Sequence, residues 1–360
     1  MLVILYFNRI TKERHFFRIA VNRDFYEGRH FLKTACFGLV VGAAISLLCG
    51  MMQSLEALML LEIAGVISLL FLPLVEVTFS MLWLVSLVIV GFNLLKNVWP
   101  VLTVLPVSFT GDKLPANILL LIAIFFVVRA FLLHYKKSIW FTPQVKSGKR
   151  GRRIAYYKWK EFSVIPLIIL FPADTYMSHV PYWPLFSFNG RSFGILVFPL
   201  LVAGAIKVFK EEPQLILKRA YGESLVLAGI SFIVAALALL ASWISLVGLL
   251  LIGIVSVLFY WQRKHLDKAG KRWYVETNDG VRVISVIPGT PAAKMGLSNG
   301  DIILDCNDEP VKNEPELYAA LQKSSAYCRL RVKTFSGELK ITESAIYAGA
   351  PHEIGLVLFQ

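Results

Sequence analysis

The residue types that catalyse reactions or bind metals are present in this chain, but their spacing does not form a catalytic site. The six histidines are scattered, and no His-Glu-x-x-His pair, the spacing that holds zinc in many metalloproteases, falls on an apolar run. A serine protease would need on the order of 150 further residues of soluble domain around its His, Asp and Ser. The sequence also lacks a glycine-rich phosphate loop. We therefore predict a protein without enzymatic activity, cofactor or metal.

Two charged side chains fall inside apolar runs that are long enough to cross a membrane. Arg129 lies about 7 Å from the inner end of its predicted helix, counted at about 1.5 Å per residue, so its long side chain can reach the lipid headgroups. Glu62 lies roughly 10 Å from the outer end of its own predicted helix. A carboxyl at that depth is either hydrogen-bonded within the protein or part of a transport path, and both interpretations remain open.

The run of residues that begins at Val281 has the local pattern of a small soluble domain. Apolar and polar residues alternate from Val281 up to a Pro-Gly pair, which predicts a strand followed by a turn. Thr290 in the N-cap position and Pro291 in the first helical position then predict a short helix. Gly300 turns the chain into a second strand, which we expect over residues 301–306.

The same run, IPGTPAAKMGLSNGDIILDCNDEPV at residues 287–311, resembles the core of a PDZ domain, whose pattern is roughly PGSPAxxAGLxxGDxIxxxNGxxV. Asp308 replaces a turn glycine of that pattern, and an Asn-Asp pair can accept the left-handed backbone region. A capping box then predicts a helix over Glu314–Lys323, and strands are expected near residues 327–334 and 338–342. In PDZ domains a glycine-containing loop and the strand after it line the peptide groove. The candidate for this loop here is EIGLVL at residues 353–358, which follows all the other elements and implies a circularly permuted PDZ domain of the bacterial type.

The resemblance implies where the peptide of a protein partner would bind. Backbone N–H groups of Ile354, Gly355 and Leu356 can turn towards a carboxylate or a carbonyl, and the peptide would add as a strand facing Tyr318 and Leu321 on the helix. Those two side chains could instead pack the core. Gly355 is expected to leave room for the peptide, so that Gly355→Val weakens binding and leaves the fold intact.

Composition places most of the chain in a membrane. Hydrophobic residues make up 56% of the 360, and the mean hydropathy of +0.63 is typical of a protein with many spans. The formal net charge is +13, but residues 273–360 hold 8 Lys and Arg against 11 Asp and Glu, which leaves +16 for the rest. Since these basic residues flank the apolar runs, they indicate the topology of the protein in the membrane rather than binding to nucleic acid.

We predict a polytopic α-helical membrane protein with about six to eight spans. The candidate runs are residues 34–52, 55–72, 74–95, 116–134, 162–172, 193–209, 224–241 and 243–261, of which 162–172 is short. The run 98–109 contains two prolines and is expected to be an outer loop or a re-entrant piece. Small residues at every fourth position of the first run, namely Gly38, Gly42, Ser46 and Gly50, predict close packing within the chain.

Four regions follow from these patterns. We expect a basic juxtamembrane segment over residues 1–33, a multi-span domain over 34–261, a basic linker over 262–272 and a PDZ domain over 273–360. The bias of Lys and Arg predicts that the basic loops and the PDZ domain lie in the cytoplasm.

Several stretches resemble the MinJ family of division-site topology proteins of Gram-positive rods. They are RITKER at residues 9–14 with Phe16 before the first full span, VPYWPLF at 180–186, and the terminal permuted PDZ domain. The resemblance implies a cell-membrane scaffold, enriched at the septum and poles, that links DivIVA to the MinC–MinD inhibitor of Z-ring assembly. The alternative is a transporter or accessory subunit whose PDZ domain recruits a cytoplasmic partner, and solute flux that depends on Glu62 would favour it.

Overall fold

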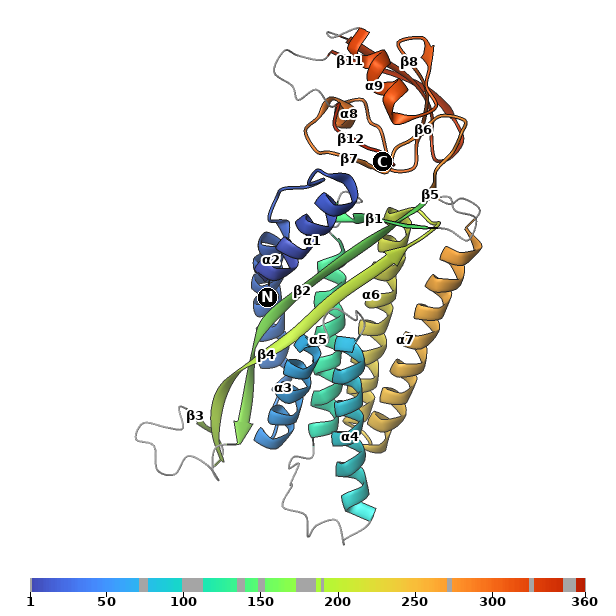
Figure 1. Ribbon diagram of the computed structural model, residues 1–360. Coiled ribbons are helices and arrows are strands. Elements are labelled where there is room, and N and C mark those ends of the chain that lie inside the picture. The colour runs from blue at the N-terminus through green and yellow to red at the C-terminus, as the bar shows by residue number, and fades with distance from the viewer. Residues whose placement is uncertain are drawn as a thin grey trace.

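The computed structural model describes residues 2–70, 77–98, 113–134, 140–147, 153–172, 186–188, 191–270, 274–323, 327–345 and 354–359 (Figure 1). Residues 2–270, called the membrane part below, form an elongated body, and residues 274–359 form a smaller C-terminal domain at one end of it. Helix α1 (Leu2–Phe17) and strand β1 (Thr142–Ser147) lie at that same end. Apart from Val98 at the end of α4, the predicted loop over 98–109 lies outside the described residues, as does most of the VPYWPLF stretch.

Five helices within the described residues are long and apolar enough to cross a membrane, as expected for a polytopic membrane protein. They are α2 (Tyr26–Cys49), α4 (Val77–Val98), α5 (Leu114–His134), α6 (Pro213–Ala238) and α7 (Trp243–Ala269). Helix α3 (Leu55–Leu70) has 16 residues. It is about 24 Å long, which is shorter than a hydrocarbon core of about 30 Å. Most of the predicted linker is helical, because α7 continues to Ala269.

Two of the predicted helical spans, residues 162–172 and 193–209, are wrong, because both segments form strands. The first lies in β2 (Arg153–Pro172) and the second in β4 (Arg191–Val208), and the strands pair antiparallel from residues 157 and 208 to residues 172 and 193. This β2–β4 ribbon runs along the helices, with β1 beside β2 at one end and β3 (Phe186–Phe188) beside β4 at the other (Figure 1). A strand rises about 3.3 Å per residue, so about eleven apolar residues in a strand span the hydrocarbon core of the bilayer, for which a helix needs about twenty.

Helix α2 covers the outer edge of β2 and satisfies backbone groups that an open sheet edge would leave without partners in lipid. Ser46 Oγ on α2 donates a hydrogen bond to Ile168 O. Just after α2, Met51 O accepts from Leu170 N–H at 3.2 Å, and Gln53 N–H donates to Leu170 O at 3.0 Å. The helix and the segment that follows it therefore act as a neighbouring strand would.

Two glycines of α2 allow this close approach to β2. A Cβ at Gly38 would lie 2.7 Å from two side-chain carbons of Ile165, and a Cβ at Gly42 would lie 2.2 Å from Leu167 Cδ2. The predicted internal packing of the small residues is thereby confirmed at these positions, although the partner is a strand. Gly50 has another role, because it ends α2 in the left-handed conformation with φ +60°.

Buried charged groups hold α1 against the start of α2. Arg9 donates to Glu27 Oε1 at 2.7 Å, and its guanidinium lies 4.5 Å from the ring centroid of Tyr26. Glu13 lies 3.4 Å from Arg9 Nη1 and accepts from Val21 N–H at 2.8 Å. Burial raises the pKa of Glu13, and the charge of Arg9 opposes that shift. These contacts fix the connection between α1 and α2.

The described residues of the C-terminal domain form two sheets and two short helices, and the predicted strands and helices are present. Its elements are β6 (Val281–Arg282), β7 (Ser285–Val286), α8 (Pro291–Lys294), β8 (Ile302–Cys306), β9 (Glu309–Pro310), α9 (Glu314–Lys323), β10 (Tyr327–Lys333), β11 (Leu339–Ala345) and β12 (Leu356–Val357). One sheet has the order β11-β10-β8-β6 with β9 on β8, and the other pairs β12 with β7.

Local signals account for this agreement. A variant of the capping box forms at the start of α9: Glu316 N–H donates to Asn313 Oδ1 at 2.9 Å, and the Glu316 carboxylate accepts from Lys312 N–H at 2.8 Å and from Asn313 Nδ2 at 2.7 Å. Asn307 and Asp308 both adopt positive φ, +50° and +65°. The departure from the glycine of the PDZ pattern is therefore accommodated by the backbone.

Candidate peptide-binding site

Strand β12 is the candidate for binding a peptide, because among the described strands it pairs only with β7, along one of its two edges. Ile287 N–H donates to Gly355 O at 2.8 Å, and Ile284 N–H donates to Val357 O at 2.8 Å. Successive residues of a strand direct their polar backbone groups to opposite edges, so those of Leu356 point away from β7. A peptide that extends this sheet would pair with Leu356.

Four of the five predicted binding residues come together in one cluster. Ile354, Leu356 and Leu321 are 5%, 5% and 6% exposed, and the half-buried Tyr318 packs against them. Helix α9, which carries Tyr318 and Leu321, lies farther from the membrane part than β7 and β12 do (Figure 1). The three aliphatic side chains fill the core beneath the strand and the helix, so Tyr318 is the one of the four with surface left for a peptide.

The structure gives a different reason for glycine at position 355 than room for a peptide. Its φ is +89°, and an added Cβ would lie 2.2 Å from Thr290 Oγ1 and 2.3 Å from Thr290 Cβ. The Cβ would therefore enter the domain rather than the path of a peptide. Thr290 occupies the expected N-cap position of α8, but its hydroxyl donates to Ile287 O at 2.6 Å instead of capping the helix. We correct the expectation that Gly355→Val leaves the fold intact.

We expect Gly355→Ala to destabilise the C-terminal domain more than Gly289→Ala. Both glycines have positive φ, +89° and +79°, and alanine at either position should cost about 1–2 kcal/mol. A Cβ at Gly289 meets nothing within 4 Å, whereas the contact of Gly355 with Thr290 should add about 1–3 kcal/mol. Hydrogen exchange of the full-length protein, read at the amides of α8 and β12, measures the difference. Equal exchange rates in the two variants would show that Thr290 can move aside without lowering the stability of the domain.

The opposite face of the β7–β12 sheet packs on the membrane part. Val357 and Ile284 are 2% and 1% exposed, and they share a cluster with Phe17 of α1 and Trp159 of β2. Tyr157 of β2 is completely buried, and its hydroxyl donates to Ile284 O at 2.6 Å. Burial raises the pKa of Tyr157 well above its usual value, which keeps the hydroxyl protonated as a donor. The candidate strand is thus fixed between the two parts of the molecule.

A short strand joins the two parts through the backbone as well. Strand β5 (Tyr274–Val275) pairs antiparallel with the start of β2, and Arg153 forms an ion pair with Glu276 at 2.6 Å. The ring of Tyr274 stacks on Phe335 of the C-terminal domain, with centroids 4.9 Å apart. The sequence gives no signal for this contact, because its partners are far apart along the chain and each is an ordinary strand or turn residue.

The other candidate residues do not add a second site. Among the residues that the structure describes, no three His, Cys, Asp or Glu side chains are grouped so that they could hold a metal ion. Glu62 is half-buried on α3, and both interpretations of it stay open.

Comparison with known proteins identifies the domain and a family. The PDZ domain family matches residues 282–334. The probable cell division topological determinant MinJ of Lacticaseibacillus paracasei is 32% identical to this chain, over 98% of the chain and 91% of the relative. The cell division topological determinant MinJ of Bacillus subtilis (strain 168) is 27% identical, over 97% of the chain and 87% of the relative. Since the similarity covers the membrane part and the PDZ domain together, the chain belongs to the MinJ family of cell division topological determinants.

Proposed function

We propose that the protein is a membrane scaffold that helps to select the division site, and that it acts by holding partners rather than by catalysis. Its PDZ domain lies in the cytoplasm and binds a peptide segment of a division protein along β12. The partners are a DivIVA-like protein and MinD of the MinC–MinD system, and the scaffold gathers at the septum and the poles.

The observation that carries this proposal is the similarity to MinJ proteins over nearly the whole chain. The structure adds two supporting features. The backbone groups of Leu356 point away from β7, which is the direction in which an added strand would pair with β12. The exposed lysines at the start of α6 and the end of α7, Lys218, Lys264 and Lys268, lie at the end of the membrane part that carries the PDZ domain, as the Lys and Arg bias of cytoplasmic segments requires.

Deletion of the gene should misplace division septa without removing an enzymatic activity. We expect long cells or minicells, and a fluorescent fusion of the full-length protein should restore cell length and concentrate at septa. Time-lapse imaging of septum position measures both effects. Cells of normal length with septa at mid-cell would contradict the division role, and solute flux in proteoliposomes that vanishes in Glu62→Gln would favour transport.

The role of the PDZ groove is tested separately by two substitutions on α9. Tyr318→Ala removes the half-buried ring beside the candidate strand, whereas Gln322→Ala truncates an exposed side chain one turn further along. We expect Tyr318→Ala to weaken co-purification of a MinD-like or DivIVA-like partner at least about tenfold, since anchoring aromatic residues often contribute 2 kcal/mol or more. Gln322→Ala should bind as the wild type does. Equal partner recovery with both variants would place the binding surface elsewhere.

A further inference from the structure

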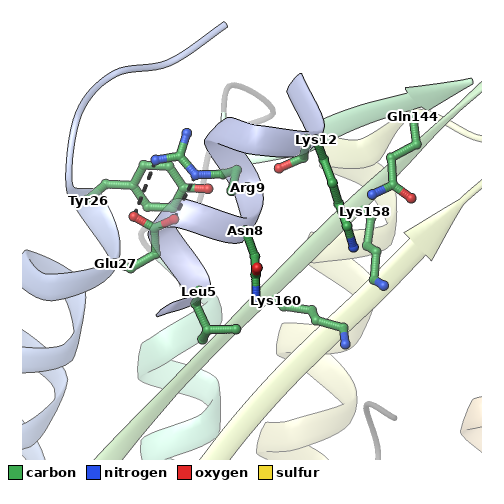
Figure 2. Close-up of a pocket in the computed structure, with 10 residues that line it drawn as sticks. Leu5, Asn8, Arg9, Lys12, Tyr26, Glu27, Gln144, Lys158 and Lys160 are labelled. Carbon is green, nitrogen blue, oxygen red and sulfur yellow. Dashed lines mark hydrogen bonds and ion pairs between the residues drawn. The ribbon is translucent and has the colours of Figure 1, made fainter. Parts of the chain in front are cut away.

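A pocket of about 150 Å³ lies where α1 crosses β1 and β2, at the end of the membrane part next to the PDZ domain (Figure 2). Its lining comes from two stretches that are distant in the sequence: Leu5, Asn8, Arg9 and Lys12 of α1 with Tyr26 and Glu27 of α2, and Thr142 and Gln144 of β1 with Lys158 and Lys160 of β2. Neither the PDZ domain nor the division role explains this pocket.

The lining carries an excess of positive charge. Arg9 and Glu27 neutralise each other on one wall, and Glu27 is the single carboxylate among the lining residues that the structure describes. The side chains of Lys12, Lys158 and Lys160 extend on the other side of the pocket (Figure 2). Three amines therefore share one small space with one carboxylate, and that carboxylate is already bound to a guanidinium.

Neighbouring amines make this space unfavourable for positive charge. Lys207 of β4 stands opposite Lys158 in the β2–β4 ribbon, so a fourth lysine lies beside the pocket. Burial, followed by repulsion from Lys158, lowers the pKa of Lys160 to about 8, and this residue lies in the polar stretch of β2 before the apolar run. An anion in the pocket would relieve this repulsion.

An apolar strip continues from the lysines towards the membrane on the same face of the ribbon. Every second residue of β2 shares a face, so Phe162 and Val164 follow Lys158 and Lys160 there. Phe162 packs with Leu201 of β4 in a cluster that includes Leu5, a residue that also lines the pocket. Leu5 and Val164 are half-buried, so part of this strip stays accessible next to the pocket.

We propose that this pocket binds the phosphate of an anionic glycerophospholipid from the leaflet on the PDZ side. Lys12, Lys158 and Lys160 surround the phosphate, and an acyl chain leaves the pocket past the half-buried side chains of Leu5 and Val164. The lysines alone would suit any phosphate ion. The half-buried apolar side chains next to the pocket, Leu5 and Val164, select a lipid, because a small hydrophilic ion gains nothing from them. The bound lipid joins α1 to the β2–β4 ribbon.

The test uses the full-length protein, purified in a neutral detergent without phosphate, and counts bound lipid by native mass spectrometry. Wild-type protein should retain phosphatidylglycerol and release phosphatidylcholine. The triple variant Lys12→Gln, Lys158→Gln, Lys160→Gln should bind phosphatidylglycerol on the order of 100-fold more weakly, given the contribution of each lysine near an anionic headgroup. Its thermal unfolding midpoint without lipid should match or exceed that of the wild type, because repulsion between like charges is removed.

A control variant that removes the same number of lysines elsewhere distinguishes a specific lipid site from general attraction between the basic protein and anionic lipid. The variant Lys218→Gln, Lys264→Gln, Lys268→Gln removes three exposed lysines at the ends of α6 and α7, and it should retain the lipid as the wild type does. Equal loss in both triple variants would overturn the proposal in favour of diffuse surface charge. Displacement of phosphatidylglycerol by millimolar inorganic phosphate would overturn the assignment to a lipid. If the first triple variant fails to fold, the single variant Lys12→Gln replaces it, because Lys12 is exposed on α1 and its substitution should not disturb the fold. Unchanged lipid retention in this single variant would contradict the proposed site.

Discussion

Replacing Arg9 with methionine is expected to lower the free energy of unfolding by about 3–5 kcal/mol, the cost of removing one partner from a buried ion pair. Arg9 is 8% exposed, and its loss would leave Glu13 and Glu27, which are 2% and 4% exposed, without their counter-charge. The shape of methionine is similar, so the effect would come from charge. Thermal or denaturant unfolding of the full-length protein in detergent measures the change.

The matched control is Arg29→Met, which breaks an ion pair with Asp24 close to the same connection. Its two side chains are 60% and 43% exposed, so we expect a loss of about 0–1 kcal/mol. The deficit of Arg9→Met should also shrink as the pH falls. Burial already raises the pKa of Glu13, and without Arg9 its folded-state pKa lies further above the unfolded value, so protonation stabilises the folded variant at low pH. A deficit that is equal at pH 5 and pH 8 would contradict this account of the network.

Gly38→Leu is expected to separate α2 from β2 and to cost about 3 kcal/mol, the upper end of the range for overpacked cores. Two carbons on the branched Cβ of Ile165 lie 2.7 Å from the position of the new Cβ. Ile165 is completely buried, and a β-branched side chain has few rotamers with which to move aside. A displaced α2 would also expose the edge of β2 to lipid. The midpoint of thermal unfolding in detergent, together with the amount of protein in the membrane fraction, measures the loss.

Gly65→Leu on α3 controls for the general effect of a large side chain on a membrane helix. A Cβ at Gly65 meets nothing within 4 Å, so this variant should unfold at the wild-type temperature. The same loss of stability in both variants would show that the cost arises from helix properties rather than from contact with β2.

The sequence predicts the PDZ domain well, because its elements depend on local chemistry. The capping box of Asn313 and Glu316, the left-handed turn at Asn307 and Asp308, and the positive φ of Gly296 and Gly300 all involve neighbours within a few positions. Such signals are readable without any knowledge of distant contacts.

The β2–β4 ribbon was predicted as two helices because a continuous apolar run fits either structure when it is buried on both sides. The signals for strands were present in the length and the residue types. The run 162–172 is too short for a helical span, and it contains Val164, Ile165, Ile168 and Ile169, which favour strands. Pro166 and Pro199 stand opposite each other in the ribbon, at positions where a missing N–H is tolerated at a sheet edge.

The lysine pocket and the contact of the PDZ domain with β2 could not be predicted, because both join distant parts of the chain. Lys12 and Lys158 come from separate segments, as do Tyr157 and Ile284. Each of these residues has an ordinary role when it is considered alone. Only the fold shows which of them meet.

Strand β2 is continuous from Arg153 beside the PDZ domain to Pro172 at the far end of the membrane part, a length of about 65 Å at about 3.3 Å per residue. Because β5 pairs with its beginning and Val357 packs in the same cluster as Trp159, the PDZ domain cannot rotate freely above the bilayer. A flexible linker would let each bound partner sample many orientations. Here every copy presents β12 at one height and in one direction, so partners on neighbouring copies are aligned before they touch one another. That alignment lowers the orientational entropy that the partners lose when they assemble.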